Sequence, residues 1–334
     1  MNEYPPEWDA VEEQPPQPSV EPLPAPRPRG RQEPETSPPR PRRQSSGRRD
    51  GNAISKLTLI ISVIALILAG IALILTLRGR QEVEPPPAPP EEPVTFRFGD
   101  QVLTPLEGMP VNPYNRDDFS LDVKGRVTYE KDGKRAKTGI DVSVYQKDID
   151  WQAVAADGID FAILRLGYRG YTEGGLFMDE YFYTNLQGAA EAGLEVGVYF
   201  FSQAITPEEA EAEAAYVLNA IEGYSVTYPI AFDWEPVAPG QGARTENLDN
   251  DTLTKCAAAF CGKVKAAGYT PAVYFNQTLG YLRYDLREVT DYGLWLAEYD
   301  TKPDFYYHFD LWQYTHTGQV EGIEGAVDLD LDLR

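Results

Sequence analysis

Strand-like and helix-like segments alternate from residue 138 to the end of the chain, and this alternation most constrains the fold. Amphipathic helical patterns follow each of the first five strand-like runs. The expected strands lie at 139–146, 161–169, 194–203, 228–236, 270–277, 294–300, 309–318 and 325–333. Such alternation indicates parallel βαβ units, and eight strands in succession predict a closed α/β barrel. The last three strands leave no room for full helices between them, so the predicted TIM-like barrel is irregular.

The expected helices lie between these strands. Their apolar stripes predict helices at 151–156, 179–192, 253–264 and 279–289. Another helix is expected to begin at Thr206, where Thr-Pro-Glu-Glu forms a capping box with proline at the first helical position.

The stretch YPIAFDWEP at 228–236 carries the clearest chemical signal. Apolar side chains occupy one face of this short strand, and Asp233 and Glu235 share the other. Buried carboxylates are costly unless they serve a purpose. Paired carboxylates hydrolyse glycosidic bonds, one as proton donor and the other as stabiliser of positive charge. A structural ion pair, or a strand end that reaches water, is the alternative interpretation.

Other polar residues also fall at the ends of expected strands. In barrels of this type the active site lies at the carboxyl ends of the strands. Asp141 lies on the first strand, Asn276 on the fifth, and Asp328 or Asp330 on the eighth. Aromatic and amide side chains that could line a cleft there are Tyr199, Tyr274, Trp295, Trp312 and Gln313. Aromatic rings suit stacking on sugars, although a single ring is more often part of a core.

Several motifs together resemble the family 25 glycoside hydrolases, the lysozyme-type muramidases of bacteria and phages. In order they are GIDVSVYQ (139–146), IDW (149–151), NLQGAAEAGLEVGVYFFSQA (185–204), AFDWE (231–235), LWLAEYD (294–300), LWQYTHTG (311–318) and GAVDLD (325–330). The resemblance covers 138–334 and implies a (β/α)5(β)3 barrel. Two positions depart from the family pattern: Lys147, where glycine is usual, and Asp330, where asparagine is commoner.

The resemblance implies cleavage of the β-1,4 bond between N-acetylmuramic acid and N-acetylglucosamine in peptidoglycan. Glu235 would be the general acid, with a pKa raised by Asp233 and a partly dry cleft. Asp233 would stabilise an oxocarbenium-like or oxazolinium species, while Asp141 and Asp328 would hold substrate or tune the pair. The sequence leaves substrate assistance and a covalent intermediate both open. The expected substrate-binding residues are Tyr199, Tyr274, Asn276, Trp295 and Gln313.

Two rival functions stay open. One is a non-catalytic peptidoglycan-binding protein on a hydrolase scaffold, although all four expected carboxylates are present. The other is a chitinase-like retaining glycosidase of the family 18 type, whose Asp-X-Asp-X-Glu motif would need an acid at Ala231. No cofactor and no metal are expected, because two cysteines and two histidines at unrelated spacings form no zinc motif. Cys256 and Cys261 are expected as small buried residues without a disulfide.

The part of the chain before the barrel predicts a membrane anchor. Residues 1–56 are expected to be a disordered cytoplasmic tail, and 57–77 form an uncharged run long enough for a transmembrane helix. Arginines and a lysine before this run outnumber the two arginines after it, which places the catalytic domain outside the cell. A Pro- and Glu-rich linker at 78–93 precedes a small β-rich region at 94–137, which could be a lid, a stalk or a brace.

The charge distribution narrows the choice of partners. The net charge of −22 reflects 30 basic and 52 acidic residues. Residues 1–56 hold equal numbers of both, so the negative charge falls on the rest of the chain. Such a surface argues against nucleic acid. The resemblance implies peptidoglycan glycan strands as the partner, and the apolar run at 57–77 predicts contact with the cytoplasmic membrane.

Overall fold

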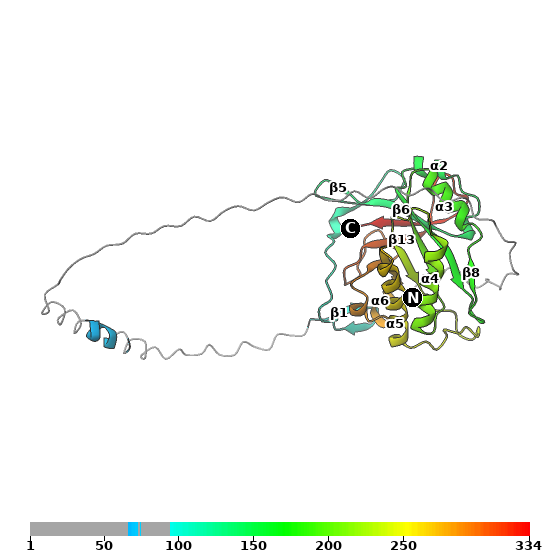
Figure 1. Cartoon of the computed structure of the whole chain (residues 1–334). Coiled ribbons are helices and arrows are strands. Elements are labelled where there is room, and N and C mark those ends of the chain that lie inside the picture. Colours follow the sequence, from blue (N-terminus) through cyan, green and yellow to red (C-terminus); the bar gives the residue numbers. More distant parts are fainter. Residues whose placement is uncertain (1–65, 73, 75–93) are drawn as a thin grey trace, which may run out of the picture. The chain divides into compact units, whose positions relative to one another are not determined.

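The computed structural model describes residues 66–72, 74 and 94–334 (Figure 1). Residues 66–72 and 74 are helical. Within the described residues, no helix has both the length and the apolar character that crossing a membrane requires. The tail expected at 1–56, most of the span expected at 57–77 and the linker expected at 78–93 lie outside the described residues.

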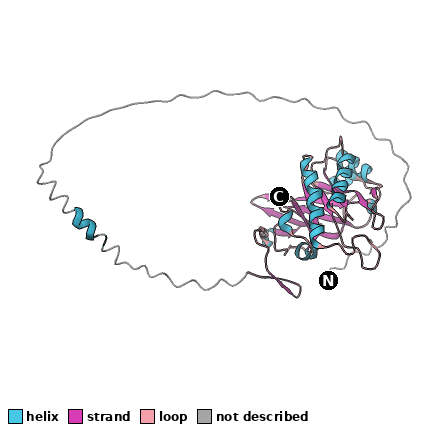
Figure 2. Ribbon diagram, turned by 60° about the horizontal axis from the view of Figure 1, so that its bottom comes forward, coloured by secondary structure: helices cyan, strands magenta, loops and turns pink. Residues whose placement is uncertain are grey.

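Eight strands close into a barrel, which confirms the expected α/β barrel class. In chain order they are β6 (Lys137–Val142), β7 (Phe161–Arg169), β9 (Glu195–Phe201), β10 (Ile230–Asp233), β11 (Pro271–Asn276), β12 (Gly293–Ala297), β13 (Leu311–Gly318) and β14 (Val327–Asp332). Strand β6 pairs with both β14 and β7, so the sheet joins its own edge (Figure 2). Only β14 runs antiparallel to its two barrel neighbours.

The first five barrel strands are each followed by a helix, as the alternation predicts. The helices are α2 (Trp151–Ala156), α3 (Phe182–Glu191), α4 (Pro207–Ala220), α5 (Asn250–Ala266) and α6 (Gln277–Leu282). Thr206 caps α4 by accepting a hydrogen bond from the Glu209 backbone, and the Glu209 carboxylate accepts one from the backbone of Ile205. Cys256 and Cys261 are buried and free, as expected.

Three local differences separate the structure from the expectation. The first expected strand ends at Val142 and continues as a 3-10 turn, η3 (Val144–Gln146). The helix expected at 279–289 ends early, and a second 3-10 turn, η4 (Leu286–Glu288), covers its later part. Strand β8 (Leu176–Met178) pairs antiparallel with the end of β7 in a segment expected to be a loop. The two 3-10 turns are three residues long and capped locally by Ser143 and Asp285, and β8 is also only three residues long, so none of them is long enough to show a periodic pattern.

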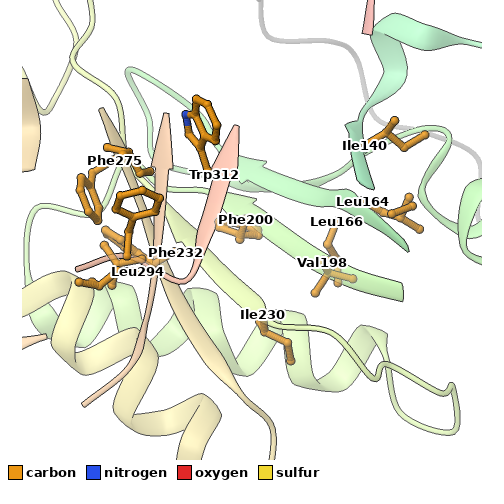
Figure 3. Close-up of a cluster of buried hydrophobic side chains, with 14 of the residues drawn as sticks. Ile140, Leu164, Leu166, Val198, Phe200, Ile230, Phe232, Phe275, Leu294 and Trp312 are labelled. Atoms are coloured by element: carbon orange, nitrogen blue, oxygen red, sulfur yellow. The ribbon is translucent and has the colours of Figure 1, made fainter. Parts of the chain in front are cut away.

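The barrel strands present two apolar layers. Side chains that point outward form the larger layer; Figure 3 labels several of them, including Phe200, Phe232 and Trp312. The inward-facing cluster comprises Phe161, Ile163, Tyr199, Tyr228, Ala231, Ala272, Tyr274, Trp295, Ala297 and Leu311. The two-faced pattern expected for 228–236 is therefore confirmed: Phe232 belongs to the outer layer and its neighbour Ala231 to the inner one.

The region before the barrel is built from short antiparallel strands. They are β1 (Phe96–Phe98), β2 (Gln101–Leu103), β3 (Phe119–Leu121), β4 (Val127–Lys131) and β5 (Lys134–Arg135), with a 3-10 turn, η2 (Arg116–Asp118), before β3. A turn at Asp132-Gly133 joins β4 to β5. Both turn residues have positive φ, 53° and 74°, which is the geometry that favours Asp-Gly in a tight hairpin.

This region packs against the part of the barrel where no helix follows the strands. Met109, Phe119, Val127 and Tyr129 are buried in the same cluster as Trp312, and the rings of Phe119 and Trp312 meet edge to face at 5.4 Å. Because α-helices follow only β6 to β11 of the described barrel strands, β3 and β4 supply apolar cover that helices give elsewhere. Of the three roles considered, these contacts fit a brace.

Candidate active site

A pocket opens at the carboxyl ends of the parallel barrel strands. Its lining comprises Asp141, Val142, Ser143, Tyr145, Gln146, Tyr199, Asp233, Glu235, Tyr274, Trp295, Tyr299, Gln313 and Asp328. All four carboxylates expected from the sequence meet here. Asp328 joins them because β14 is antiparallel, so the start of that strand lies beside Asp141 at the end of β6. The two candidates left open on the last strand are thereby separated: Asp328 lines the pocket, and Asp330 lies deeper in the barrel.

Four of the five expected substrate-binding residues line this pocket, and Asn276 does not. The Asn276 side chain caps α6, where Oδ1 accepts a hydrogen bond from the Leu279 backbone at 3.0 Å. Trp312, another cleft candidate, belongs to the outer layer and donates to the Glu298 carbonyl at 2.8 Å. Neighbouring residues on a strand face opposite ways, so Gln313 reaches the pocket while Trp312 does not.

Residues that follow β9 support the two acids at the end of β10, of which Asp233 ends the strand and Glu235 comes two residues after it. Asp233 is buried at the end of β10, and Glu235 is half-buried two residues later. The Ser202 backbone donates to the Asp233 carbonyl at 2.6 Å. Fully buried Gln203 donates to the Glu235 carbonyl at 3.5 Å and accepts from Thr245 at 2.5 Å. The sequence analysis did not predict these supporting residues, although Ser202 and Gln203 lie within the motif at 185–204.

The electrostatics of the pocket favour retention of a proton. Burial raises the pKa of the Glu235 carboxyl to about 7. Burial also raises the pKa of Asp233, the charges of Glu235 and Asp141 add to the rise, and the Arg165 guanidinium opposes it. Oδ1 of Asp233 is buried and has no hydrogen-bond partner among the residues that the structure describes, which further disfavours the ionised form. The pair therefore holds a proton near neutral pH, as a general acid requires.

Asp141 is held by a short hydrogen-bond chain. Gln313 donates from Nε2 to Oδ2 of Asp141 at 2.7 Å. The Gln313 carbonyl oxygen accepts from the hydroxyls of Tyr274 at 2.8 Å and Tyr299 at 3.1 Å. Because both hydroxyls point at that oxygen, the amide nitrogen faces Asp141. Burial raises the pKa of Asp141 well above its usual range, and the neighbouring carboxyl of Asp330 adds to the rise.

A buried ion pair shapes the wall of the pocket. Arg165 of β7 donates to Oδ2 of Asp179 at 2.7 Å. The same oxygen accepts the Val144 backbone at 3.0 Å, which ties the η3 turn to the pair. The Arg165 guanidinium also lies 5.2 Å from the centre of the Tyr145 ring, which lines the pocket. This pair was not predicted; its signal is Arg165, which follows the apolar run 161–164 in the middle of a strand.

Metal ligation is a separate question. In the part of the chain that the structure describes, no group of three or more His, Cys, Asp or Glu side chains is arranged to hold a metal ion.

An α/β barrel with paired carboxylates at the carboxyl ends of its strands, one with a raised pKa, has the arrangement of a glycoside hydrolase. Residues 140–323 match the family described as glycosyl hydrolases family 25, and the chain belongs to that family. It is 31% identical over 194 residues to the autolytic lysozyme of Clostridium acetobutylicum. This alignment covers 58% of the chain and 54% of that lysozyme, so the chain spans about half of its length.

Solved structures of similar proteins agree with this assignment. The modular autolysin LytC of Streptococcus pneumoniae matches with a TM-score of 0.51 and 27% identity, over 64% of this chain and 56% of that one. LytC has also been solved in complex with a synthetic peptidoglycan ligand. A family 25 glycosyl hydrolase from Bacillus anthracis shares the fold, with a TM-score of 0.50 and 23% identity over 62% of this chain and 93% of that one.

Proposed function

We propose that this chain hydrolyses the β-1,4 bond between N-acetylmuramic acid and N-acetylglucosamine in peptidoglycan. The observation that carries the proposal is the Asp233–Glu235 pair, which faces Asp141 and Asp328 in one pocket and includes a carboxyl with a pKa of about 7. Family membership and the similarity to an autolytic lysozyme support peptidoglycan as the substrate.

The bond-breaking step follows from the two carboxyls. Glu235 donates its proton to the glycosidic oxygen as the bond from that oxygen to the anomeric carbon of N-acetylmuramic acid breaks. Positive charge then develops on the sugar beside Asp233. That charge lowers the pKa of Asp233 by Coulomb attraction, so the carboxylate form is favoured when it is needed. Water finally adds to the anomeric carbon, and its proton returns to Glu235.

Aromatic side chains and Asp141 give the pocket the means to hold a glycan. Tyr199, Tyr274 and Trp295 present rings, and Asp141 and Gln313 present hydrogen-bonding groups. Sugars are bound in proteins by this combination of an apolar face and convergent polar groups. We assign these residues, with Asp328, to substrate binding and to tuning of the catalytic pair.

The test is to digest purified peptidoglycan with the full-length chain and to reduce the products with borohydride. Reduced muramic acid at the new ends is the expected result. Reduced glucosamine at those ends would replace the muramidase proposal with a different glycosidase. Binding to peptidoglycan without any soluble product would instead favour the non-catalytic scaffold.

We further propose that residues 57–77 anchor the protein in the cytoplasmic membrane and that residues 94–334 lie outside. The uncharged run and the excess of positive charge before it support this orientation. Protease added to intact protoplasts should remove residues 94–334 and spare 1–56. A mature chain that begins near residue 80 in the culture medium would contradict the anchor and indicate a cleaved signal peptide.

A further inference from the structure

Asp330 is a buried carboxyl that the catalytic proposal does not use. It is fully buried, with 0% of its surface exposed, and lies two residues after Asp328 on β14. Asp328 pairs in register with Asp141, and Asp330 pairs with Gly139. Asp330 therefore lies diagonally across from Asp141 on the inner face of the barrel.

Gly139, the residue in register with Asp330, leaves room for the ring of Phe161. A Cβ atom at Gly139 would lie 2.2 Å from that ring, so no larger residue fits there without a shift. The Asp330 carboxyl itself contacts Trp295 of the inward-facing cluster. The place is dry and apolar apart from a few polar partners.

The partners of Asp330 account for only one of its two oxygens. Trp295 donates from Nε1 to Oδ1 at 2.8 Å. Oδ2 is buried, and no donor reaches it from the described residues. Asp330 lies one diagonal step from Asp141 in the β14–β6 register, and each carboxyl shifts the pKa of the other. Two neighbouring carboxyls in a site without water are not both ionised. A proton shared between them gives Oδ2 of Asp330 a hydrogen-bond partner.

We propose that Asp330 is a positioning residue that shares one proton with Asp141 and, together with Gln313, holds the Asp141 carboxyl in place at the pocket. The part of this inference that concerns glycan binding rests on the proposed function. The shared proton itself does not, because it follows from the burial and contacts of the two carboxyls.

Several groups face this pair from neighbouring strands. They are Asp328 on β14, Trp295 on β12, and Gln313 and Tyr314 on β13. On the pocket side, the groups that interact with the charge of Asp141 are Asp233, Glu235, Tyr199, Tyr274 and Tyr299. Burial raises the pKa of Asp330 to about 8, against the lowering effect of the Trp295 hydrogen bond. No cation is among these causes, so the pair keeps its proton through the neutral range.

The first test measures the proton without any enzyme assay. In the unfolded chain both aspartates release their protons near about pH 3.9, whereas the native pair keeps one up to about pH 8. Between these two pH values the native protein binds one more proton than the unfolded protein. The free energy of unfolding therefore falls as pH rises through this range. Asp330→Asn removes the effect, because its amide can donate to Asp141 and its carbonyl can accept from Trp295.

The stability of Asp330→Asn relative to wild type should therefore rise with pH. The ratio of their unfolding constants is expected to change about tenfold per pH unit from pH 5 to 8, and to level off above that. Asp332→Asn is the matched control on the same strand. Hydrogen bonds from Arg334 and Tyr228 outweigh burial and lower the pKa of Asp332, so its replacement should show no such rise in this window. A constant difference between Asp330→Asn and wild type would overturn the shared proton.

The second test measures positioning through ligand binding in the Glu235→Gln background, which removes the titration of the general acid. The probe is a soluble tetrasaccharide of alternating N-acetylglucosamine and N-acetylmuramic acid. Adding Asp330→Leu should weaken binding about tenfold, since Asp141 loses its hydrogen bond, whereas Asp330→Asn should restore it. The Glu235→Gln variant, which keeps Asp330, should also lose affinity above about pH 8, where the shared proton is released. The double variant with Asp330→Asn should keep its affinity there.

These outcomes separate the two proposals. Equal affinity with leucine, asparagine and aspartate at residue 330 would overturn the positioning role. Failure of the Glu235→Gln variant to bind the tetrasaccharide at any pH would count against the proposed function, while the unfolding experiment would still decide the shared proton. If Asp330→Leu does not fold, the asparagine variant alone keeps both measurements decisive.

Discussion

Gln313 donates a hydrogen bond from Nε2 to Oδ2 of Asp141 at 2.7 Å, although the two residues are 172 positions apart in the chain. The bond connects β13 to β6 across the intervening strand β14. The carbonyl oxygen of the same amide accepts from Tyr274 and Tyr299. One side chain thus links the pocket residues of four different segments, so the geometry of Asp141 depends on barrel closure.

Replacing Glu235 with glutamine should abolish turnover and leave the fold intact. The amide cannot donate the proton that the leaving oxygen needs, and general acid catalysis contributes about 10²- to 10⁴-fold. Peptidoglycan turnover and urea unfolding of the same preparation give the two measurements. Glu222→Gln, at an exposed position, is the control. Wild-type turnover by Glu235→Gln would mean that another group is the acid.

The pH profile should lose activity on its alkaline side near pH 7. A carboxyl whose pKa is raised to about 7 is protonated below that pH and ionised above it, so the acid form of Glu235 disappears as pH rises. Values of kcat/KM for a short soluble glycan should fall about tenfold per pH unit above pH 7 to 8. Activity that keeps rising to pH 9 would be incompatible with this assignment.

Gln313→Leu and Asn276→Ala should separate a pocket residue from a helix cap. The leucine variant removes the donor to Asp141 and the acceptor of two hydroxyls, so both substrate affinity and stability should fall, the latter by about 1–3 kcal/mol. Asn276→Ala should cost about 1 kcal/mol of stability through the lost cap, with KM unchanged. A large rise in KM for Asn276→Ala would return this residue to the substrate site.

Phe119→Ala should destabilise the barrel without changing its chemistry. The Phe119 ring is buried against Trp312, and truncation of a buried phenylalanine costs about 3–5 kcal/mol. Leu121→Ala on the same strand is the control, because Leu121 is 55% exposed and its loss should cost less than about 0.5 kcal/mol. Chemical denaturation tests both variants. A change in kcat of folded Phe119→Ala would favour a lid over a brace.

Local patterns in the sequence were sufficient for the barrel class and for the strand that leads to the proposed catalytic pair. The alternation of period-2 and period-3.6 segments located the eight barrel strands and the helices that follow the first five. Proline boundaries and a two-faced pattern identified the strand with Asp233 and Glu235. These features depend on residues near one another in the chain, so they can be read without a tertiary structure.

Only the tertiary structure decided which polar residues meet. Asn276 and Gln313 both occur near the ends of strands, but one caps its own helix and the other reaches across the barrel to Asp141. Arg165 pairs with Asp179 across an irregular segment of 14 residues, and Asp330 lies diagonal to Asp141 because β14 pairs with the distant strand β6. The direction and burial of such side chains depend on the closure and register of the barrel. A periodic pattern determines which face of a strand is buried, but not which side chains of other strands contact that face.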